Sequence, residues 1–426
     1  MAKIQKSKQI VTPFGGVFLT NEAFTQSGMS KLIDNELGKR FSIDYQYSDI
    51  FRSIFDIFLC GGDCMEDIQT HLRPTLENIP NNKVPSADTL LRGIKELATI
   101  NTEIISSSGK SYNFNINEKM NDLNLKSLLL TGQLKAGGCY DLDYDNQILE
   151  HEKYDAKRTY KHNTGYFPGV ASIGNIIAYI ENRDGNANVK TAQKETLERM
   201  FKLFKKNDID VDRARMDAGS YCKDVISLVE ANCNLFYIRA NKCDDLTARI
   251  REITDWKTVE INYKNYQVAS LPFTQFLKEL GLRLVVMREK NANGQTDLFT
   301  GDDFIYRCIL TNDHQGTEKE IIEYYNQRGG AEKLFDIQNN DFGWNHLPCS
   351  DMNYNTVYLI LTAMVKNFYN YLLGKISKIF KDISPVARLK QFIFRFIAVS
   401  GKWIRQGRQW KILLYTNKPY EKLKFT

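Results

Sequence analysis

Apolar residues in the first hundred positions follow a helical period. Phe51, Ile54, Phe55 and Phe58 recur at the spacing that places side chains on one face of a helix. A second helix is predicted to begin near residue 87, with Ser86 as its cap. Short helices of this kind are compatible with a helix-turn-helix unit and equally with a plain helical bundle. The pattern alone does not choose between the two.

The pattern changes after a polar stretch at 107–125, which we interpret as a connector. Alternating or short apolar segments predict strands, and apolar residues at helical spacing predict helices between them. Strands are expected at 137–150, 167–180, 211–216 and 235–240, and helices around 197–204 and 221–232. Strands and helices in this order indicate an α/β fold.

Short strand-like pieces separated by polar turns occupy residues 242–303 and indicate a β-rich insertion. The α/β pattern then resumes with a strand at 304–311, a helix from Thr317 and a long helix at 354–380. We therefore divide the chain into five segments: a helical N-terminal part at 1–125, the two parts of an α/β core at 126–241 and 304–375, the insertion at 242–303, and a C-terminal segment at 376–426.

Charge is unevenly distributed. The whole chain has a formal net charge of +6, yet residues 371–426 hold 13 Lys/Arg and only 2 Asp/Glu. A basic segment on a slightly acidic body indicates a negatively charged partner, although a solubilising tail has the same composition. Trp403 and Trp410 stand among the basic residues, either to stack on nucleic-acid bases or to anchor a small core. The basic residues interleaved with these tryptophans, which could neutralise phosphates, are Lys402, Arg405, Arg408 and Lys411.

Nothing in the sequence indicates a membrane protein. The first ten residues are basic without an apolar stretch, and the longest apolar run, 357–365, is too short to span a bilayer. We therefore expect a cytoplasmic protein. The eight cysteines include no Cys-x-x-Cys pair, which argues against a zinc site.

Three carboxylates share one predicted strand. Because strand side chains alternate, Asp141, Asp143 and Asp145 should lie on the same face. Such acids repel one another, and a hard cation such as Mg²⁺ is the simplest compensation. A solvated strand end would also tolerate them. Asp217 is a second candidate, at the end of the predicted strand 211–216, where ligands gather in open α/β sheets, although an Asp before Gly-Ser is also a common helix cap.

A third group of candidate residues lies on a predicted helix. Tyr325, Arg328 and Glu332 are spaced so that they share one helix face. Arginine clamps phosphates, tyrosine stacks or donates a hydrogen bond, and glutamate completes a metal site, whereas a simple Arg328–Glu332 surface ion pair is the plainer interpretation. The glycine pair 329–330 inside the helix is costly and suggests close approach of another backbone or of DNA.

The order Asp, Asp, Glu in an interrupted α/β pattern resembles the RNase H-like catalytic domain of bacterial insertion-sequence DDE transposases. The helix motif is similar to their Y-x2-R-x3-E-x6-K signature, except that Asn339 stands at the lysine position, for which Lys333 is the nearest replacement. The family's first acid is usually followed by x-Thr, and this chain has Asp145 at the threonine position. Asp141 and Asp143 therefore compete as first acid, and we favour Asp143.

The resemblance implies that Asp143, Asp217 and Glu332 are catalytic and hold two Mg²⁺ ions, for which Mn²⁺ can substitute, with Asp141 as the alternative first ligand. It also implies an RNase H-like mixed sheet with a β-rich insertion. Expected DNA contacts are Tyr325, Arg328, Lys333 and Arg239, together with the C-terminal cations Lys402, Arg405, Arg408 and Lys411.

The implied partner is double-stranded DNA, namely the terminal inverted repeats of an element and its target, bound by a homodimer in cut-and-paste transposition. The N-terminal helices are then candidates for recognition of the element ends, and the protein is expected near the bacterial nucleoid. Two other functions remain open. One is a catalytically inactive, transposase-derived DNA-binding protein. The other is a phosphatase with an aspartyl-phosphate intermediate, whose D-x-D-x-T motif the segment from Asp141 to Asp145 partly matches.

Overall fold

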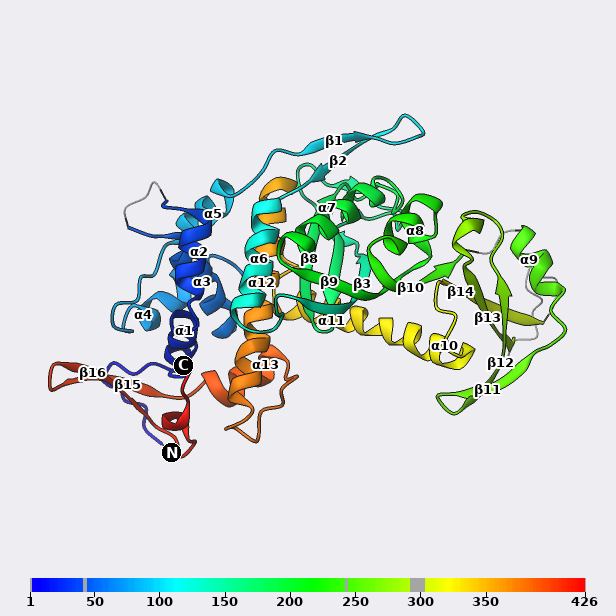
Figure 1. Cartoon of the computed structure of the whole chain (residues 1–426). Coiled ribbons are helices and arrows are strands. Elements are labelled where there is room, and N and C mark those ends of the chain that lie inside the picture. Colours follow the sequence, from blue (N-terminus) through cyan, green and yellow to red (C-terminus); the bar gives the residue numbers. More distant parts are fainter. Residues whose placement is uncertain (1, 41–43, 242–243, 292–302, 426) are drawn as a thin grey trace.

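The computed structural model describes residues 2–40, 44–241, 244–291 and 303–425. One mixed sheet runs through the middle of the elongated molecule (Figure 1). Its strand order is β1-β2-β8-β7-β3-β9-β10-β14-β13-β12-β11. In chain order these strands are Thr102–Ile105 (β1), Ser111–Asn115 (β2), Gly138–Asn146 (β3), Gly169–Ile173 (β7), Ile176–Arg183 (β8), Ile209–Met216 (β9), Cys233–Ala240 (β10), Lys257–Ile261 (β11), Lys264–Pro272 (β12), Arg283–Lys290 (β13) and Phe304–Thr311 (β14).

Five central strands define the fold. β3, β9 and β10 are parallel neighbours, β7 is antiparallel to β3, and β8 is antiparallel to β7. Numbered along the chain from β3, their order is 3-2-1-4-5, which is the RNase H-like arrangement expected from the sequence. The parallel strands bring their carboxyl ends to one edge of the sheet, where side chains from different strands can meet.

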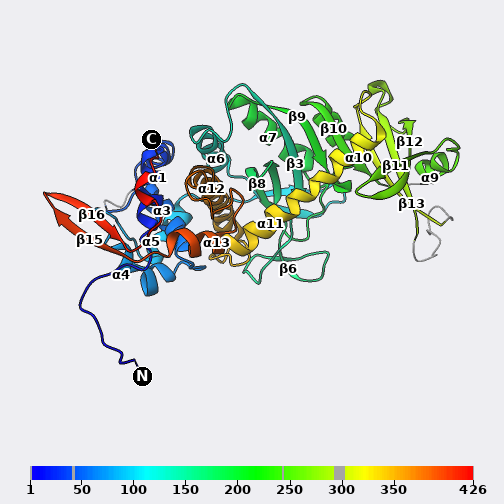
Figure 2. The same ribbon diagram turned by 90° about the horizontal axis from the view of Figure 1, so that it is seen from below.

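Helices cover both faces of this sheet. α7 (Gln193–Lys206) and α8 (Lys223–Glu230) pack on one face, sharing a core with β3, β9 and β10. The other face is covered by α10 (Glu318–Asn326), α11 (Gly330–Asp341) and α12 (Met352–Ile376), and α11 continues the line of α10 along the molecule (Figure 2). α6 (Glu118–Leu130) packs beside α12 against β8.

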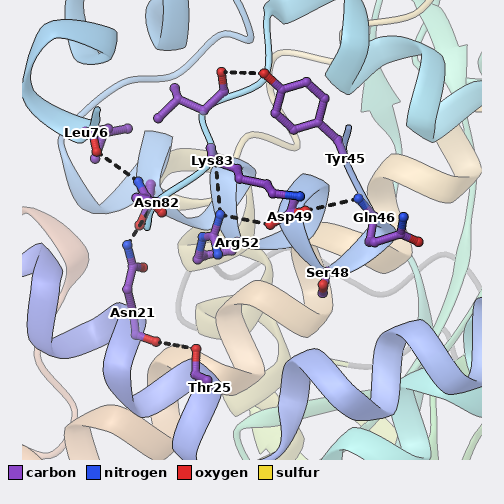
Figure 3. Close-up of polar contacts among 12 residues, drawn as sticks. Asn21, Thr25, Tyr45, Gln46, Ser48, Asp49, Arg52, Leu76, Asn82 and Lys83 are labelled. Atoms are coloured by element: carbon purple, nitrogen blue, oxygen red, sulfur yellow. Dashed lines mark hydrogen bonds and ion pairs between the residues drawn. The ribbon is translucent and has the colours of Figure 1, made fainter. Parts of the chain in front are cut away.

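The N-terminal helices share one hydrophobic core with α12. They are α1 (Val17–Gln26), α2 (Met29–Leu37), α3 (Tyr47–Leu59), α4 (Arg73–Leu76) and α5 (Ala87–Glu96), with a π-helical turn at Ile68–Leu72. Ser86 caps α5 as expected, because its side chain accepts a hydrogen bond from the Thr89 amide. Figure 3 shows how Arg52 of α3 joins Asp49 of the same helix to the Lys83 carbonyl and so fixes the loop that leads to α5.

One segment differs from the sequence interpretation. The expected connector at 107–125 contains β2, which pairs with β1 and β8, and the first two turns of α6. Their polar residues are used for hydrogen bonding: Asn121 and Asn124, for example, bind backbone groups of β8. The segment at 242–303 contributes the strands β11, β12 and β13, which extend the main sheet beyond β14. It also contains α9 (Asp244–Arg251), while Cys243 and residues 292–302 lie outside the described residues.

The C-terminal segment folds back onto the N-terminal helices. It contains α13 (Leu389–Phe392), a π-helical turn at Ile393–Ile397, a hairpin of β15 (Gly401–Gln406) and β16 (Gln409–Leu414), and a 3-10 turn at Tyr420–Lys422. Trp403 packs edge-on against Phe18 of α1, with ring centroids 4.9 Å apart. A small separate sheet of β4 (Leu149–Glu150), β5 (Lys157–Arg158) and β6 (Thr164–Tyr166) follows β3. No helix among the described residues is long and apolar enough to cross a membrane.

A buried lysine fixes α12 on the sheet. Lys366 is 2 % exposed and donates a hydrogen bond to the Asn175 carbonyl in the turn between β7 and β8. Its neighbour Asn367 bonds to both the amide and the carbonyl of Ile177. Burial lowers the pKa of Lys366 to about 7, because the charged ammonium loses its hydration.

We predict a pH-dependent stability difference between the wild type and Lys366→Met. The unfolded chain binds a proton at Lys366 up to about pH 10.4, whereas the folded chain releases it near pH 7. Between these values the unfolded state holds more protons, so the wild type gains about 1.4 kcal/mol of stability per pH unit relative to the variant. Urea unfolding from pH 7.5 to 9.5 measures this difference. A pH-independent difference would show that Lys366 is not buried as a neutral amine.

Candidate active site

Two carboxylates stand side by side at the ends of parallel strands. Tyr144 of β3 pairs with Met216 of β9, so the residues that follow, Asp145 and Asp217, lie next to each other at the carboxyl edge. Asp145 is the penultimate residue of β3, and Asp217 directly follows β9. A strand order that makes β3 and β9 neighbours is therefore the cause of this pairing.

The other two acids of β3 are neutralised by arginines of β9. Asp141 receives two hydrogen bonds from Arg213, at 2.8 and 2.6 Å, and Asp143 receives two from Arg215, at 2.7 and 2.8 Å. The ring of Tyr324 from α10 covers both guanidinium groups, at 4.1 and 4.6 Å. These fork-shaped pairs use both oxygens of each carboxylate.

Asp143 is the more deeply buried of the two paired acids. Only 7 % of Asp143 and 8 % of Arg215 are exposed, and Arg215 also donates to the Tyr324 carbonyl. Burial raises the pKa of Asp143, and the charge of Arg215 opposes that effect. Asp143, the acid favoured from the sequence, therefore lies in a closed ion pair. It is two residues before Asp145, farther from the carboxyl edge of the sheet.

Asp145 and Asp217 are held differently from the two paired acids. Asp145 accepts a single hydrogen bond from an arginine, 2.7 Å from Arg328, and one of 3.0 Å from the adjacent Asn146 amide. Asp217 accepts one of 3.0 Å from the Gly219 amide. Burial raises the pKa of Asp217, and the negative charge of Asp145 raises it further. The positive charge of Arg328 opposes both effects on the pKa of Asp217. The edge thus concentrates negative charge that one arginine only partly offsets.

The expected helix motif faces this edge. α10 begins at a capping box formed by Thr317 and Glu320, and a 3-10 turn at Gln327–Gly329 joins it to α11. Tyr325 donates a 3.2 Å hydrogen bond to the Met216 carbonyl, directly before Asp217. Glu332 lies in the first turn of α11, about one helical turn beyond Arg328, and is exposed.

The glycines between Arg328 and Glu332 meet open space. Gly329 and Gly330 have φ of −54° and −62°, values that any residue adopts, and no protein atom lies within 4 Å of the position where either would carry a Cβ. Nothing in the described protein therefore requires glycine here. The helix surface is therefore open at these two positions.

The remaining sequence candidates lie in three places. Arg239 of β10 is exposed and lines a pocket of about 330 Å³ together with Tyr325. Lys333 is exposed directly after Glu332. Asn339 lies further along α11, and its buried side-chain amide oxygen has no hydrogen-bond partner among the described residues. The four C-terminal cations are on the β15–β16 hairpin, on the far side of α12 from this edge (Figure 1).

The donor chemistry at the edge suits a divalent metal. Carboxylate oxygens are the ligands that Mg²⁺ and similar hard cations prefer, and a cation would relieve the repulsion between Asp145 and Asp217. Within the described residues, three close potential ligands are found only at Asp63, Cys64 and Asp67, remote from this edge. Asp145, Asp217 and Glu332 do not form such a cluster in the described structure, and Glu332 is the acid in the first turn of the adjoining α11.

Comparison with known proteins places these residues in a family. Residues 8–425 match the family described as transposase DDE domain group 1. The chain belongs to this DDE transposase family. No curated protein sequence matches it. Among solved structures, it is similar to a piggyBac transposase in a cryo-EM synaptic complex with hairpin DNA, with a TM-score of 0.46 and 13 % identity over 89 % of this chain and 79 % of that one.

Membership in the DDE transposase family implies a divalent-metal nuclease and strand-transfer chemistry, and it does not favour the phosphatase alternative. Sequence reasoning missed the arginine partners of this transposase chain. Arg213 and Arg215 alternate on β9 as Asp141 and Asp143 alternate on β3, and this matching period of two was the available signal. The register of the two strands, which decides that Asp145 faces Asp217, has no equivalent signal.

We predict that Asp143→Asn is more destabilising than Asp145→Asn. The first change leaves Arg215 buried without a counter-charge and should lower the free energy of unfolding by about 3 kcal/mol. The second breaks a pair that is about one fifth exposed and should cost about 1 kcal/mol or less. Urea unfolding in metal-free buffer measures both. If Asp143→Asn instead stabilised the protein, Asp143 would be repelled by the neighbouring carboxylates in the absence of metal, as expected of a metal ligand.

Proposed function

We propose that this chain is an active DNA transposase that cuts and joins DNA strands at the edge formed by Asp145 and Asp217. The observation that carries the proposal is the adjacency of these two half-buried carboxylates, with the helix of Arg328 and Glu332 beside them. Family membership supports the same chemistry. Because Asp143 is closed off by Arg215, we assign the first metal-facing position to Asp145 and give Asp143 the role of holding Arg215 under Tyr324.

Asp145, Asp217 and Glu332 would hold the metal, which we propose to be two Mg²⁺ ions with Mn²⁺ as a substitute. When bound, the metal supplies activation of the attacking oxygen and charge stabilisation on the leaving oxygen. Glu332 is exposed in the first turn of α11, and we assign it the third position. We keep Asp141 paired with Arg213, outside the ligand set.

The surrounding residues position the DNA. Arg328 presents a guanidinium beside both acids and would transfer from Asp145 to a phosphate when metal neutralises that carboxylate. Tyr325 keeps the helix against the end of β9 through the Met216 carbonyl. Lys333 and Arg239 are exposed on the two sides of this motif and would contact phosphates further along the strand.

The substrate we propose is duplex DNA that carries the terminal inverted repeats of a bacterial insertion sequence, followed by its target. Cut-and-paste transposition by a homodimer would use the same edge twice, first to release the element end and then to join it. The open space at the Cβ positions of Gly329 and Gly330 supports a bulky substrate such as a duplex beside this helix.

We predict that Asp145→Asn, Asp217→Asn and Glu332→Gln each reduce metal-dependent cleavage by at least roughly 1,000-fold, because each removes one negative oxygen donor. The assay is cleavage of a labelled duplex that carries the element's own ends, with Mg²⁺. Asp141→Asn is the matched control, since it removes an acid of the same strand that is engaged by Arg213. It should retain most of the cleavage.

Two outcomes would contradict this assignment. Loss of cleavage in a stably folded Asp143→Asn variant, with Asp145→Asn active, would return the first position to Asp143. Binding of DNA by the wild type without any cleavage would support an inactive, DNA-binding relative.

We further predict that Mn²⁺ stabilises the wild type in the absence of DNA. A ligand that binds only the folded state raises stability by about 2.7 kcal/mol at a concentration 100 times its Kd. The increase in unfolding temperature should disappear in Asp217→Asn and persist in Asp141→Asn. Equal increases in all three proteins would place the metal elsewhere, and the cluster of Asp63, Cys64 and Asp67 would be the next site to mutate.

A further inference from the structure

The β15–β16 hairpin projects from the body of the molecule at the end opposite the insertion (Figures 1 and 2). Its base is held by the packing of Trp403 on Phe18 and by two backbone hydrogen bonds between Thr12 and Gly401. Beyond this base, exposure increases steadily, and residues 405–411 are all exposed. The hairpin is therefore an anchored arm with a solvent-exposed outer half.

The arm is cationic and has no acid close to it in sequence. Residues 383–420 contain eight Lys/Arg and no Asp or Glu, and residues 1–21, which meet the hairpin at Thr12, contain three Lys and no acid. Ion pairs neutralise many cations elsewhere, such as Arg213 and Arg388. Within the part of the chain that the structure describes, no ion pair is formed by any of the four cations of the arm, Lys402, Arg405, Arg408 and Lys411.

The turn of the hairpin carries a cation in a strained position. Gly407 and Arg408 both have positive φ, 59° and 62°, as a two-residue type I′ turn requires. Asparagine and glycine suit such a turn, whereas arginine adopts positive φ at a cost. An exposed arginine at the tip therefore gains nothing for the fold. It places a positive charge at the outermost point of the arm.

The two faces of the ribbon differ. Cross-strand pairs place Gln406 opposite Gln409 and Ile404 opposite Lys411 on one face. The other face carries Trp403 at the base and the Arg405–Trp410 pair further out, with the guanidinium 5.8 Å from the ring centre. The first face thus combines paired amides at the tip with lysines nearer the base, while the second is turned toward the protein at Trp403.

We propose that this hairpin is a β-ribbon that enters the major groove of duplex DNA, with Gln406 and Gln409 toward the base edges and the four cations on the flanking phosphates. The major groove admits a two-stranded ribbon, and glutamine pairs with adenine there. Six residues per strand give the arm a reach of about 20 Å, enough to span the groove. This inference rests on the proposed transposase function. It assigns to the hairpin a DNA contact that is separate from the cleavage edge at Asp145 and Asp217.

The test measures binding of the full chain to an element-end duplex over a range of salt concentrations. Changing the four cations, Lys402, Arg405, Arg408 and Lys411, to Gln should reduce the slope of log K against log salt by about 3 to 4, because each phosphate contact contributes about 0.9. Lys110, Lys202, Lys205 and Lys278 are exposed elsewhere, and changing these four to Gln is the charge-matched control. Equal slopes for the two variants would overturn the inference.

Two gentler variants separate charge from base contact. Gly407→Asn with Arg408→Gly builds a favoured turn without the tip charge and should lower the slope by about 1 while the hairpin stays folded. Gln406→Ala with Gln409→Ala should leave the slope unchanged but reduce the preference for element ends over a scrambled duplex by about 10-fold or more. Unchanged preference would remove the base-contact role. Methylation of guanine N7, which blocks the major groove, should weaken wild-type binding, and interference only by a minor-groove ligand would overturn the groove assignment.

Cleavage distinguishes failure of this inference from failure of the proposed function. At saturating DNA the four-cation variant should still cleave with Mg²⁺, because the hairpin lies apart from Asp145 and Asp217. A wild type that binds DNA but never cuts it contradicts the proposed function and leaves the arm's DNA contact to be judged by the slopes. If the cation variants change self-association in sedimentation and leave DNA binding intact, the arm contacts a second copy of the chain, and the DNA inference fails.

Discussion

The row of acids on β3 constrains everything placed around it. Three carboxylates on one strand face can be buried only if each finds a positive partner, and the protein supplies Arg213, Arg215 and Arg328 from two different elements. The first two pairs are closed forks under Tyr324 and hold β3, β9 and α10 together. The third involves an arginine that reaches in from the helix beside an exposed glutamate. Along one strand, the acids therefore change from ion pairs that stabilise the fold, at Asp141 and Asp143, to the proposed metal ligand Asp145.

This gradient also explains why the edge suits a metal. Asp145 faces Asp217 with only one shared arginine between them, so negative charge is left over where the sheet opens to solvent. On the adjoining helix, Gly329 and Gly330 leave the surface open at their Cβ positions. The proposed cleavage edge and the proposed DNA-binding hairpin are separated, because the hairpin lies on the other side of α12 (Figure 1). A long substrate such as DNA can contact both.

The sequence alone determined much of the fold of this chain. Period-two and helical spacing located β3, β7, β8, β9, β10, β14 and the long helices, since hydrophobic periodicity reports on local burial. The order of these elements indicated an α/β fold, and the resemblance to DDE transposases implied the RNase H-like class. The motif of Tyr325, Arg328 and Glu332 was also local, because helix geometry places residues at such spacing on one side.

Only the tertiary structure decided which acids meet. The choice among Asp141, Asp143 and Asp145 depends on the register of β3 against β9, including the irregularity after Tyr140, and a register of parallel strands leaves no mark in either strand alone. The same holds for Trp403 and Trp410, identical in type, of which the first packs on Phe18 and the second is 51 % exposed. The residue types alone predicted a metal site at the acids of β3 and a DNA contact at the C-terminal cations. Long-range packing decided which acid lies at the edge and which tryptophan is buried.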